Sequence, residues 1–257
     1  MKYGVTHLAV IPMRAQPSEC AEMVSQLLFG DVYLVVEEKD SWIKIQTCDC
    51  DYLGWIDRKL FNPLPESEVA FYLSTPKWIV DEPFIPIKIK DIEITFPIFI
   101  GSSFPYPQDK VVKLGDVIFE MDLKSQDSPS PNNFISFAKK FLHTPYLWGG
   151  RSIAGIDCSG FSQLVYKSMQ ISIPRDASQQ ALLGETVDFV AESKPGDLAF
   201  FQNEEGRIIH VGIIIEEGKI IHASGWVRID ILDETGIYNV DTHTYTHNLR
   251  IIKRILS

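Results

Sequence analysis

Three residues in the C-terminal half of the chain could together perform nucleophilic chemistry: Cys158, His210 and His222. A cysteine attacks as its thiolate, so it needs a base that takes its proton and a third polar group that fixes the tautomer and orientation of that base. We assign these roles to Cys158, His210 and His222 in that order. The sequence therefore predicts a thiolate–imidazolium pair.

Cys158 falls at the predicted start of a helix. Asp157 is a natural N-cap, and the apolar residues after it recur at three- and four-residue steps: Phe161, Leu164, Val165 and Met169. In the first helical turn the free N–H groups and the helix dipole stabilise an anion, so we expect a lowered pKa for the thiol. Cysteine is also a common buried apolar residue, but the capped position and the downstream histidines favour a nucleophile.

The two histidines fall in two predicted antiparallel strands, 208–215 and 219–223, joined by a hairpin signal at 216–218. If the loop has an odd number of residues, His210 and His222 share one face, opposite or one step diagonal. Directly opposite side chains lie about 4.5–5.5 Å apart at Cβ. An even loop would separate the pair. A single histidine in such a hairpin is usually a hydrogen-bonded core residue, whereas two beside a helix-start cysteine favour catalysis.

Metal binding is the alternative for these residues. A Cys-His-His set could hold zinc, but it would need a fourth ligand or a bound water. Cys48 and Cys50 form a single pair with no second pair nearby. The remaining histidines lie near turns or ends, and we interpret them as surface or structural residues: His7, His143, His243 and His247. We therefore expect no metal and no cofactor.

Length and composition limit the possible classes. A chain of 257 residues with 45% apolar and 23% charged residues is typical of a globular protein of two or three compact units. The formal net charge of −10 argues against nucleic acid and anionic membranes as partners. Neither a transmembrane run nor a signal peptide is visible. We expect a cytoplasmic monomer; a removed leader would instead make it periplasmic or lipid-anchored.

The chain divides into three predicted domains. Residues 1–64 read as short strands separated by turns, which is typical of a small all-β barrel. Residues 65–131 are also strand-rich and predict a second, divergent barrel that ends in a polar, proline-rich linker. Residues 132–257 form the third domain, which begins with a helix from Asn132 or Asn133 through Leu142 and contains the candidate nucleophile.

Six motifs of this third domain resemble, in order, those of NlpC-type cysteine peptidases, which are cell-wall peptide hydrolases: YLWGG at 146–150, GIDCSGF at 155–161, PRDASQ at 174–179, PGDL at 195–198, HVGI at 210–213 and IHA at 221–223. Segments 26–30, 40–45 and 52–56 resemble bacterial SH3-like domains. The whole chain is similar to YkfC-like γ-D-glutamyl-L-diamino acid endopeptidases. The resemblance implies an α+β fold, with a C-terminal minimal papain-like cysteine peptidase domain preceded by two small SH3-like β-barrels.

The resemblance also implies a reaction. It is hydrolysis of the bond between γ-D-Glu and an L-diamino acid, meso-diaminopimelate or lysine, in free peptidoglycan stem peptides with an unblocked N-terminal L-Ala. The partners would be small peptides released during turnover and recycling of the cell wall. Two alternatives stay open: a cell-wall amidase or acyltransferase on the same papain-like scaffold, and a binding module with an inactive C-terminal domain.

Catalytic roles follow from the same resemblance. Cys158 would be the nucleophile, His210 the general base and then the acid, and His222 the residue that orients His210. Tyr146 occupies the tyrosine position that precedes the cysteine in the family. Its phenol, together with the backbone N–H of Cys158, could donate to the oxyanion.

The substrate-binding residues are likewise implied by resemblance. Asp157, Ser159 and Ser178 match positions that face the dipeptide part of the substrate, and Trp148 would line the same pocket. Asp157 would pair with the free ammonium as well as cap the helix. An acid and a tyrosine of the first SH3-like domain would close the groove, and the candidates are Glu22 and Tyr52, with Glu19 as the alternative acid. A buried ammonium requires such a carboxylate partner.

Overall fold

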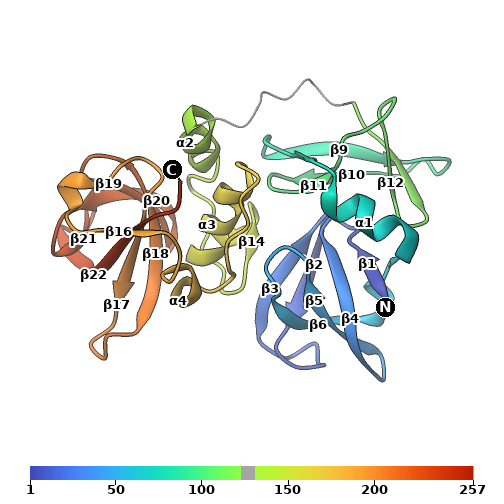
Figure 1. Ribbon diagram of the computed structural model, residues 1–257, viewed down its shortest axis with the longest axis horizontal. Coiled ribbons are helices and arrows are strands. Elements are labelled where there is room, and N and C mark those ends of the chain that lie inside the picture. Colours follow the sequence, from blue (N-terminus) through green and yellow to red (C-terminus); the bar gives the residue numbers. More distant parts are fainter. Residues whose placement is uncertain (123–130, 257) are drawn as a thin grey trace. The chain divides into compact units, whose positions relative to one another are not determined.

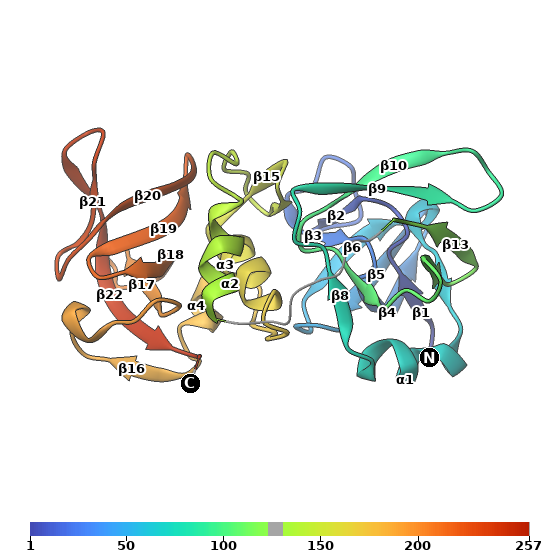
Figure 2. The same ribbon diagram turned by 90° about the horizontal axis from the view of Figure 1, so that it is seen from above.

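The computed structural model describes residues 1–122 and 131–256. The fold is α+β, and the chain forms two compact units (Figures 1 and 2). The first unit consists of Met1–Ser128 and Trp148–Ile153, and the second of Pro129–Leu147 and Ala154–Ser257. None of the helices within the described residues is long and apolar enough to cross a membrane. The predicted three-domain division at 64 and 131 stays a prediction.

The first unit begins with an antiparallel sheet of seven strands in the order β3-β2-β6-β5-β4-β1-β7. In β5 the side chains of Ile43, Ile45 and Thr47 are buried while those between them are more exposed, as expected for a strand with one face on a core. This is the SH3-like domain expected from the sequence. The strands are β1 (Tyr3–Val5), β2 (Val10–Arg14), β3 (Met23–Leu28), β4 (Val32–Lys39), β5 (Trp42–Thr47), β6 (Leu53–Asp57) and β7 (Pro63–Leu64), with a 3-10 turn at Arg58–Leu60.

A second group of strands completes the first unit, after a helix that the sequence did not predict. It contains a four-stranded sheet, β10-β9-β13-β12, and a two-stranded sheet, β11-β8. Its core is continuous with that of the first sheet, because Phe29 packs edge-on against Phe119 and Phe104 at ring-centroid distances of 4.9 and 5.7 Å. The elements are α1 (Glu66–Ser74), β8 (Lys77–Ile79), β9 (Phe84–Ile89), β10 (Thr95–Phe99), β11 (Ser103–Pro105), β12 (Val111–Leu114) and β13 (Val117–Glu120).

The segment 148–153, which includes β14 (Arg151–Ser152), is held in the first unit by a buried arginine. The backbone N–H of Arg151 donates to Gln26 Oε1 at 2.8 Å, and its guanidinium lies 3.3 Å from Asp49 Oδ2 and 3.6 Å from Asp31 Oδ2. Gly149 has φ +75°, and a Cβ there would lie 2.2 Å from the carbonyl oxygen of Met23. Glycine is therefore required for this segment to approach β3.

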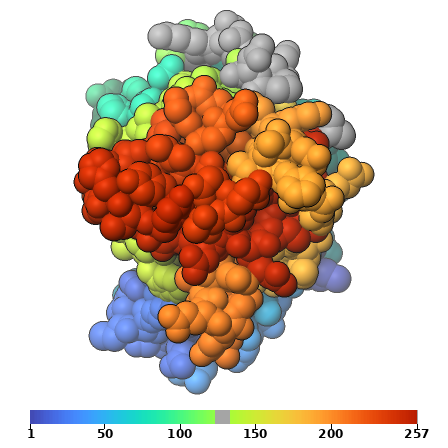
Figure 3. Space-filling model, turned by 90° about the vertical axis from the view of Figure 1, so that its left-hand side faces the viewer, coloured from blue at the N-terminus to red at the C-terminus, as the bar shows by residue number. Residues whose placement is uncertain are grey.

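The second unit is a seven-stranded sheet covered on one side by three helices (Figures 1 and 2). The strand order is β16-β22-β17-β18-β19-β20-β21, and β21 also pairs with β22, so the sheet closes on itself. Figure 3 shows its C-terminal strands, in orange and red, exposed on one face. The strands of this sheet are β16 (Glu185–Val187), β17 (Leu198–Gln202), β18 (Ile208–Glu216), β19 (Lys219–Ser224), β20 (Trp226–Leu232), β21 (Gly236–Asn239) and β22 (Thr244–Arg254), with a 3-10 turn at Val190–Glu192. The short strand β15 (Gly155–Ile156) lies outside the sheet.

The helices of this unit are α2 (Pro131–Lys139), α3 (Cys158–Lys167) and α4 (Ala177–Gln180). Aromatic contacts join α3 to α2 and to the turn that follows it, and a hydrogen bond from Ser162 Oγ to Gln180 Oε1, at 2.7 Å, joins α3 to α4. Phe134 meets Tyr166, and Phe141 meets Phe161, at centroid distances of 5.3 and 5.6 Å. The predicted helix from 132 or 133 through 142 begins at 131 and ends at 139. Because α3 packs on β18 and β19, the start of α3 lies beside the strands that carry the candidate histidines.

Candidate active site

Cys158 is the first residue of α3, as predicted. Asp157 has an extended backbone, with φ −94° and ψ 174°, and its Oδ1 accepts a hydrogen bond from the N–H of Gly160 at 2.7 Å. Such a side-chain cap satisfies one of the free donors at the helix start. The Cys158 side chain is buried, with 7% of its surface exposed, and the backbone of Val211 and of Ser159 acts to lower the pKa of its thiol.

The expected lowering of the cysteine pKa is wrong for the free protein. Burial, followed by the neighbouring Asp157 carboxylate, raises the pKa of Cys158 to about 12, against the opposing effects of the backbone hydrogen bonds and of Arg175. The free-energy cost of removing the thiolate from water exceeds the stabilisation that the helix start gives to the negative charge. The nucleophile must therefore form by proton transfer to a neighbouring base, rather than by ionisation into solvent.

Asp157 has a buried partner that the sequence did not reveal. Arg175 binds both of its carboxylate oxygens, with Nη2–Oδ2 and Nη1–Oδ1 distances of 2.5 and 3.0 Å, and also donates to Ser159 Oγ at 2.8 Å. This two-pronged geometry is the strong form of a carboxylate–guanidinium pair. Asp157 and Ser159 thus lie together, as the resemblance implied, but any substrate ammonium would share the carboxylate with Arg175. Ser178 lies on α4 with its side chain exposed.

The histidines lie on one face of the hairpin, but not through an odd loop. Only residues 217 and 218 join β18 to β19, and the β-bulge before Glu216 restores the shared face that an even loop alone would have removed. His222 is directly opposite Gly212 in the β18–β19 pair, which places His210 one step diagonal, with a bulge between Ile214 and Glu216. His210 Nε2 is 2.9 Å from His222 Nδ1. A Cβ at Gly212 would lie 2.9 Å from that of His222, so the glycine of the HVGI motif makes room for the second histidine.

A buried carboxylate continues this chain of hydrogen bonds. His222 Nε2 lies 3.0 Å from Asp230 Oδ2 on β20, and Arg228 contacts both oxygens of Asp230 at 2.7 and 2.9 Å. Burial raises the pKa of the Asp230 carboxyl, but hydrogen bonds from His222, Arg228 and the backbone of Val240 outweigh it and lower the pKa to about 2. Asp230 is therefore ionised at neutral pH.

The ionised carboxylate determines both tautomers. Asp230 can only accept, so His222 carries its proton on Nε2 and presents a lone pair at Nδ1. That lone pair accepts the Nε2–H of His210. His210 is consequently left with a lone pair on Nδ1, the position of a general base. Burial, and after it the neighbouring histidines, lower the pKa of His210 well below its usual value. His210 is therefore neutral in the resting enzyme, before it takes the proton of the cysteine.

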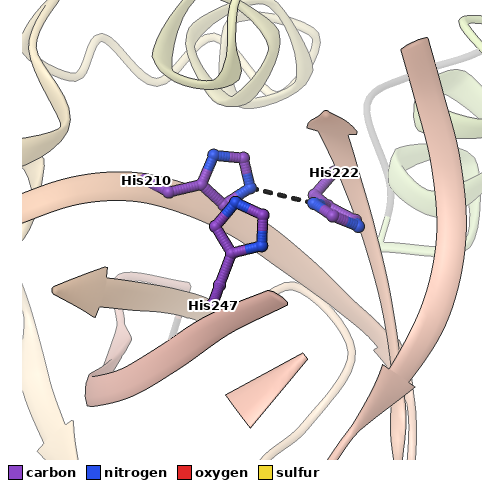
Figure 4. Close-up of side chains that lie close together, drawn as sticks. All are labelled: His210, His222 and His247. Carbon is purple, nitrogen blue, oxygen red and sulfur yellow. Dashed lines mark hydrogen bonds between the residues drawn. The ribbon is translucent and has the colours of Figure 1, made fainter. Parts of the chain in front are cut away.

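A third histidine, which the sequence analysis assigned to the surface or to a structural role, belongs to this cluster. His247, on β22, is half-buried and stacks on His210 with a centroid distance of 4.3 Å and an interplanar angle of 28°. Figure 4 shows its ring beside those of His210 and His222. Burial, and secondarily His222, lowers the pKa of His247 to about 4.

Tyr146 is half-buried near the cysteine. Its backbone N–H donates to the carbonyl of Gly225 at 2.9 Å, and the residue forms a bridge with Ile156 just before α3. Burial first, and then the negative charge of a Cys158 thiolate, raise the pKa of the phenol. The hydroxyl therefore stays protonated and able to donate, as an oxyanion contact requires.

The remaining predicted residues lie in the first unit. The indole Nε1–H of Trp148 donates to the carboxylate of Glu22, and both side chains are exposed. This contact selects Glu22 over Glu19 as the acid associated with Trp148. Tyr52 is half-buried directly before β6, where it packs against the core of the first sheet.

Comparison with known proteins agrees with the predicted resemblance. Residues 143–247 match the NlpC/P60 family, and residues 13–59 match the bacterial dipeptidyl-peptidase Sh3 domain. A γ-D-glutamyl-L-lysine dipeptidyl-peptidase from Bacillus subtilis is 32% identical over 217 residues, which cover 77% of this chain and 71% of the relative. The protein of the same name from Bacillus cereus is 29% identical, over 79% of this chain and 67% of the length of that relative.

Solved structures show the same architecture. An NlpC/P60 family protein from Bacillus cereus aligns with a TM-score of 0.82 and 23% identity, over 99% of this chain and 100% of its own. An NlpC/P60 endopeptidase from Photobacterium damselae gives a TM-score of 0.74 at 16% identity, over 97% and 70% of the two chains. The present chain belongs to the NlpC/P60 family. The predicted assignment to the peptidases, and so to the hydrolases, is confirmed.

Proposed function

We propose that the protein is a cysteine endopeptidase that hydrolyses the bond between γ-D-Glu and an L-diamino acid in free peptidoglycan stem peptides whose N-terminal L-Ala is unblocked. The observation that carries the proposal is the hydrogen-bonded chain His210–His222–Asp230, which leaves His210 Nδ1 free to act as a base. The two relatives that align with more than three quarters of this chain are both named γ-D-glutamyl-L-lysine dipeptidyl-peptidases, which supports this substrate class.

The proposed reaction begins with proton transfer. The thiol of Cys158 gives its proton to His210 Nδ1, and the imidazolium is stabilised by its Nε2–H donating to His222. The backbone of Val211, the neighbour of His210, favours the thiolate form of Cys158. The thiolate then attacks the γ-carbonyl carbon of D-Glu.

The tetrahedral intermediate carries its negative charge on the former carbonyl oxygen. The N–H of Cys158, which lies in the first helical turn and lacks an intrahelical acceptor, and the protonated phenol of Tyr146 would donate to it. His210 then gives its proton to the amine of the leaving diamino acid. Water, activated by the neutral His210, hydrolyses the thioester, which releases L-Ala-γ-D-Glu and restores the thiol.

Acidic and polar side chains are proposed to recognise the free amino terminus of the substrate. Asp157, with Ser159 and Ser178, would contact the dipeptide. A carboxylate is the natural partner of a desolvated ammonium. We further propose a monomer that acts on small peptides in the cytoplasm.

Mass spectrometry of defined peptides tests this function. L-Ala-γ-D-Glu-meso-diaminopimelate and its lysine analogue are incubated with the protein, beside the same peptides still attached to muramic acid. Release of L-Ala-γ-D-Glu from the free peptides alone, lost in Cys158→Ala, supports the proposal. Equal cleavage of both forms would remove the requirement for a free amino terminus. Absence of cleavage by folded protein would shift the assignment to an amidase or acyltransferase.

A further inference from the structure

The three clustered histidines suggest a second kind of ligand. His210, His222 and His247 come from three different strands, and one ring nitrogen of each lies within 4.8 Å of the others (Figure 4). Two of the three side chains are buried and the third is half-buried. We propose that this cluster binds a single divalent transition-metal ion such as Zn²⁺, and that the bound ion switches the peptidase off.

The spacing of the nitrogens is close to that of a metal site. With Zn–N bonds of about 2.0–2.1 Å in tetrahedral geometry, two ligand nitrogens lie about 3.3 Å apart. The contact between His210 Nε2 and His222 Nδ1, at 2.9 Å, must therefore open by about 0.4 Å. The widest pair, within 4.8 Å, must close by about 1.5 Å at most.

Neighbouring groups already orient two of the rings in the manner of metal ligands. His222 uses Nε2 on the Asp230 carboxylate at 3.0 Å, which leaves Nδ1 for a metal. His247 uses Nδ1 on Thr246 Oγ1 at 2.8 Å, which leaves Nε2. Metal-binding histidines commonly hydrogen-bond through the other ring nitrogen to a carboxylate or another polar group, which fixes their tautomer and orientation.

The kind of ligand selects the kind of metal. Three imidazoles suit zinc, copper, nickel or iron, whereas magnesium and calcium prefer oxygen ligands. A water molecule would supply the fourth position, as it does at other three-histidine zinc sites. Zinc is the suitable first probe because it has no redox chemistry of its own.

A metal bound at His210 prevents this residue from acting as the catalytic base. This inhibition rests on the proposed function, whereas the metal binding itself does not. In the resting tautomer, His210 carries its proton on Nε2 and its lone pair on Nδ1. A metal bound at Nε2 takes the place of that proton, which moves to Nδ1 if the ring stays neutral. Nδ1 is then protonated and can no longer accept the proton of Cys158. Inhibition follows without any contact between the metal and the sulfur.

Isothermal titration of ZnCl₂ into metal-free Cys158→Ala tests the site without any need for activity. We expect one zinc per chain in Cys158→Ala and in the wild type with the same affinity. His247→Leu should weaken binding by about 100-fold, since loss of an outer-shell group alone costs 10–100-fold. His143→Asn is the matched control, because His143 is exposed and has φ 68°, which asparagine tolerates; its affinity should equal that of the parent. Unchanged affinity in His247→Leu, or loss of binding in Cys158→Ala, would overturn the site.

X-ray absorption at the zinc edge of the wild-type protein provides a test that depends on no variant. Nitrogen or oxygen scatterers at about 2.0–2.1 Å with an imidazole signature are expected, and a sulfur at about 2.3 Å would contradict the assignment. Peptidase assays then test the consequence. Zinc should inhibit at the concentration at which it binds, and a chelator should restore activity. Full peptidase activity with zinc bound would overturn the switch. If the metal-free protein binds zinc but never cleaves the peptide, the result counts against the proposed function alone.

Discussion

His247 stacks on His210 with ring centroids 4.3 Å apart, although 37 positions separate the two in the sequence. The two rings come from β22 and β18, which are separated by β17 in the sheet. Because the pKa of His247 is lowered to about 4, the ring is neutral at the pH where the peptidase is proposed to work. The neighbour of the proposed general base His210 is therefore a neutral aromatic ring. Protonation of His210 is not opposed by a positive charge on His247.

A permanent charge at this position should reduce catalysis. His247→Lys places an ammonium beside the imidazolium that His210 must become, so we expect kcat/KM to fall by about 10–100-fold, equivalent to roughly 1.4–2.8 kcal/mol of transition-state stabilisation. His247→Gln, which is neutral, should lose less. Steady-state kinetics with the free tripeptide compares the two. An equal loss in both variants would show that charge at this position has no part in the effect.

Replacement of Asp230 tests the tautomer argument. Asp230→Asn replaces one carboxylate oxygen with an NH₂ donor, so residue 230 no longer fixes the proton of His222 on Nε2. We expect kcat to fall by about 10²–10⁴-fold with little change in KM, as in other triads with the wrong tautomer. Asp241→Asn is the matched control, since Asp241 also pairs with Arg228 at 2.7 Å but is largely exposed. A rise in KM with kcat intact in Asp230→Asn would contradict the assigned role.

The glycine of the HVGI motif should be indispensable. In Gly212→Ala the new Cβ would lie 2.6 Å from Ile220 Cδ1 and 2.9 Å from His222 Cβ, so we expect a loss of about 1–3 kcal/mol of stability together with most of the activity. Adding Ile220→Val removes the contact with Cδ1 and leaves those with Cγ1 of residue 220, at 2.8 Å, and with His222 Cβ. Thermal unfolding should then recover in part while activity stays low. Recovery of both would show that Gly212 is needed for packing alone.

The buried histidines should make stability depend on pH. The unfolded His247 binds a proton below its ordinary pKa of 6.5, whereas the folded side chain binds one only below about 4. Between these values the unfolded state holds the extra proton, so the free energy of unfolding falls as pH falls through this window, by up to about 1.4 kcal/mol per pH unit for each such group. His210 and His222, whose pKa values are also lowered, add to the trend. Unfolding midpoints measured from pH 7 to pH 4 should show a shallower slope in His247→Gln, and an identical slope would contradict this origin.

The local sequence predicted those features of the site that depend on neighbouring residues. The Asp157 cap and the placement of His210 and His222 on two paired strands follow from helix and hairpin patterns that span about a dozen residues. The shared face of the two histidines depends in addition on the bulge between Ile214 and Glu216, which the hairpin pattern did not predict. Asp230 and Arg228 carry a partial signal, as charged residues at alternate positions of an otherwise apolar strand, 226–232.

Features that depend on distant pairings could not be predicted in this way. His247 reaches His210 only because β22 pairs with β17 and β21, and such long-range pairing leaves no local pattern. The raised pKa of Cys158 depends on burial, which a helix-start argument does not measure. The Arg175–Asp157 pair likewise joins two segments 18 residues apart through the fold.

The most direct test of the central claim is intact-protein mass spectrometry after acid quenching during turnover of L-Ala-γ-D-Glu-diaminopimelate. The account predicts a transient L-Ala-γ-D-Glu acyl group on the protein, which digestion after quenching places on the peptide that contains Cys158. The group should be absent in Cys158→Ala and longer-lived in variants of His210. Turnover without any acyl adduct, or an adduct on another residue, would contradict Cys158 as the nucleophile.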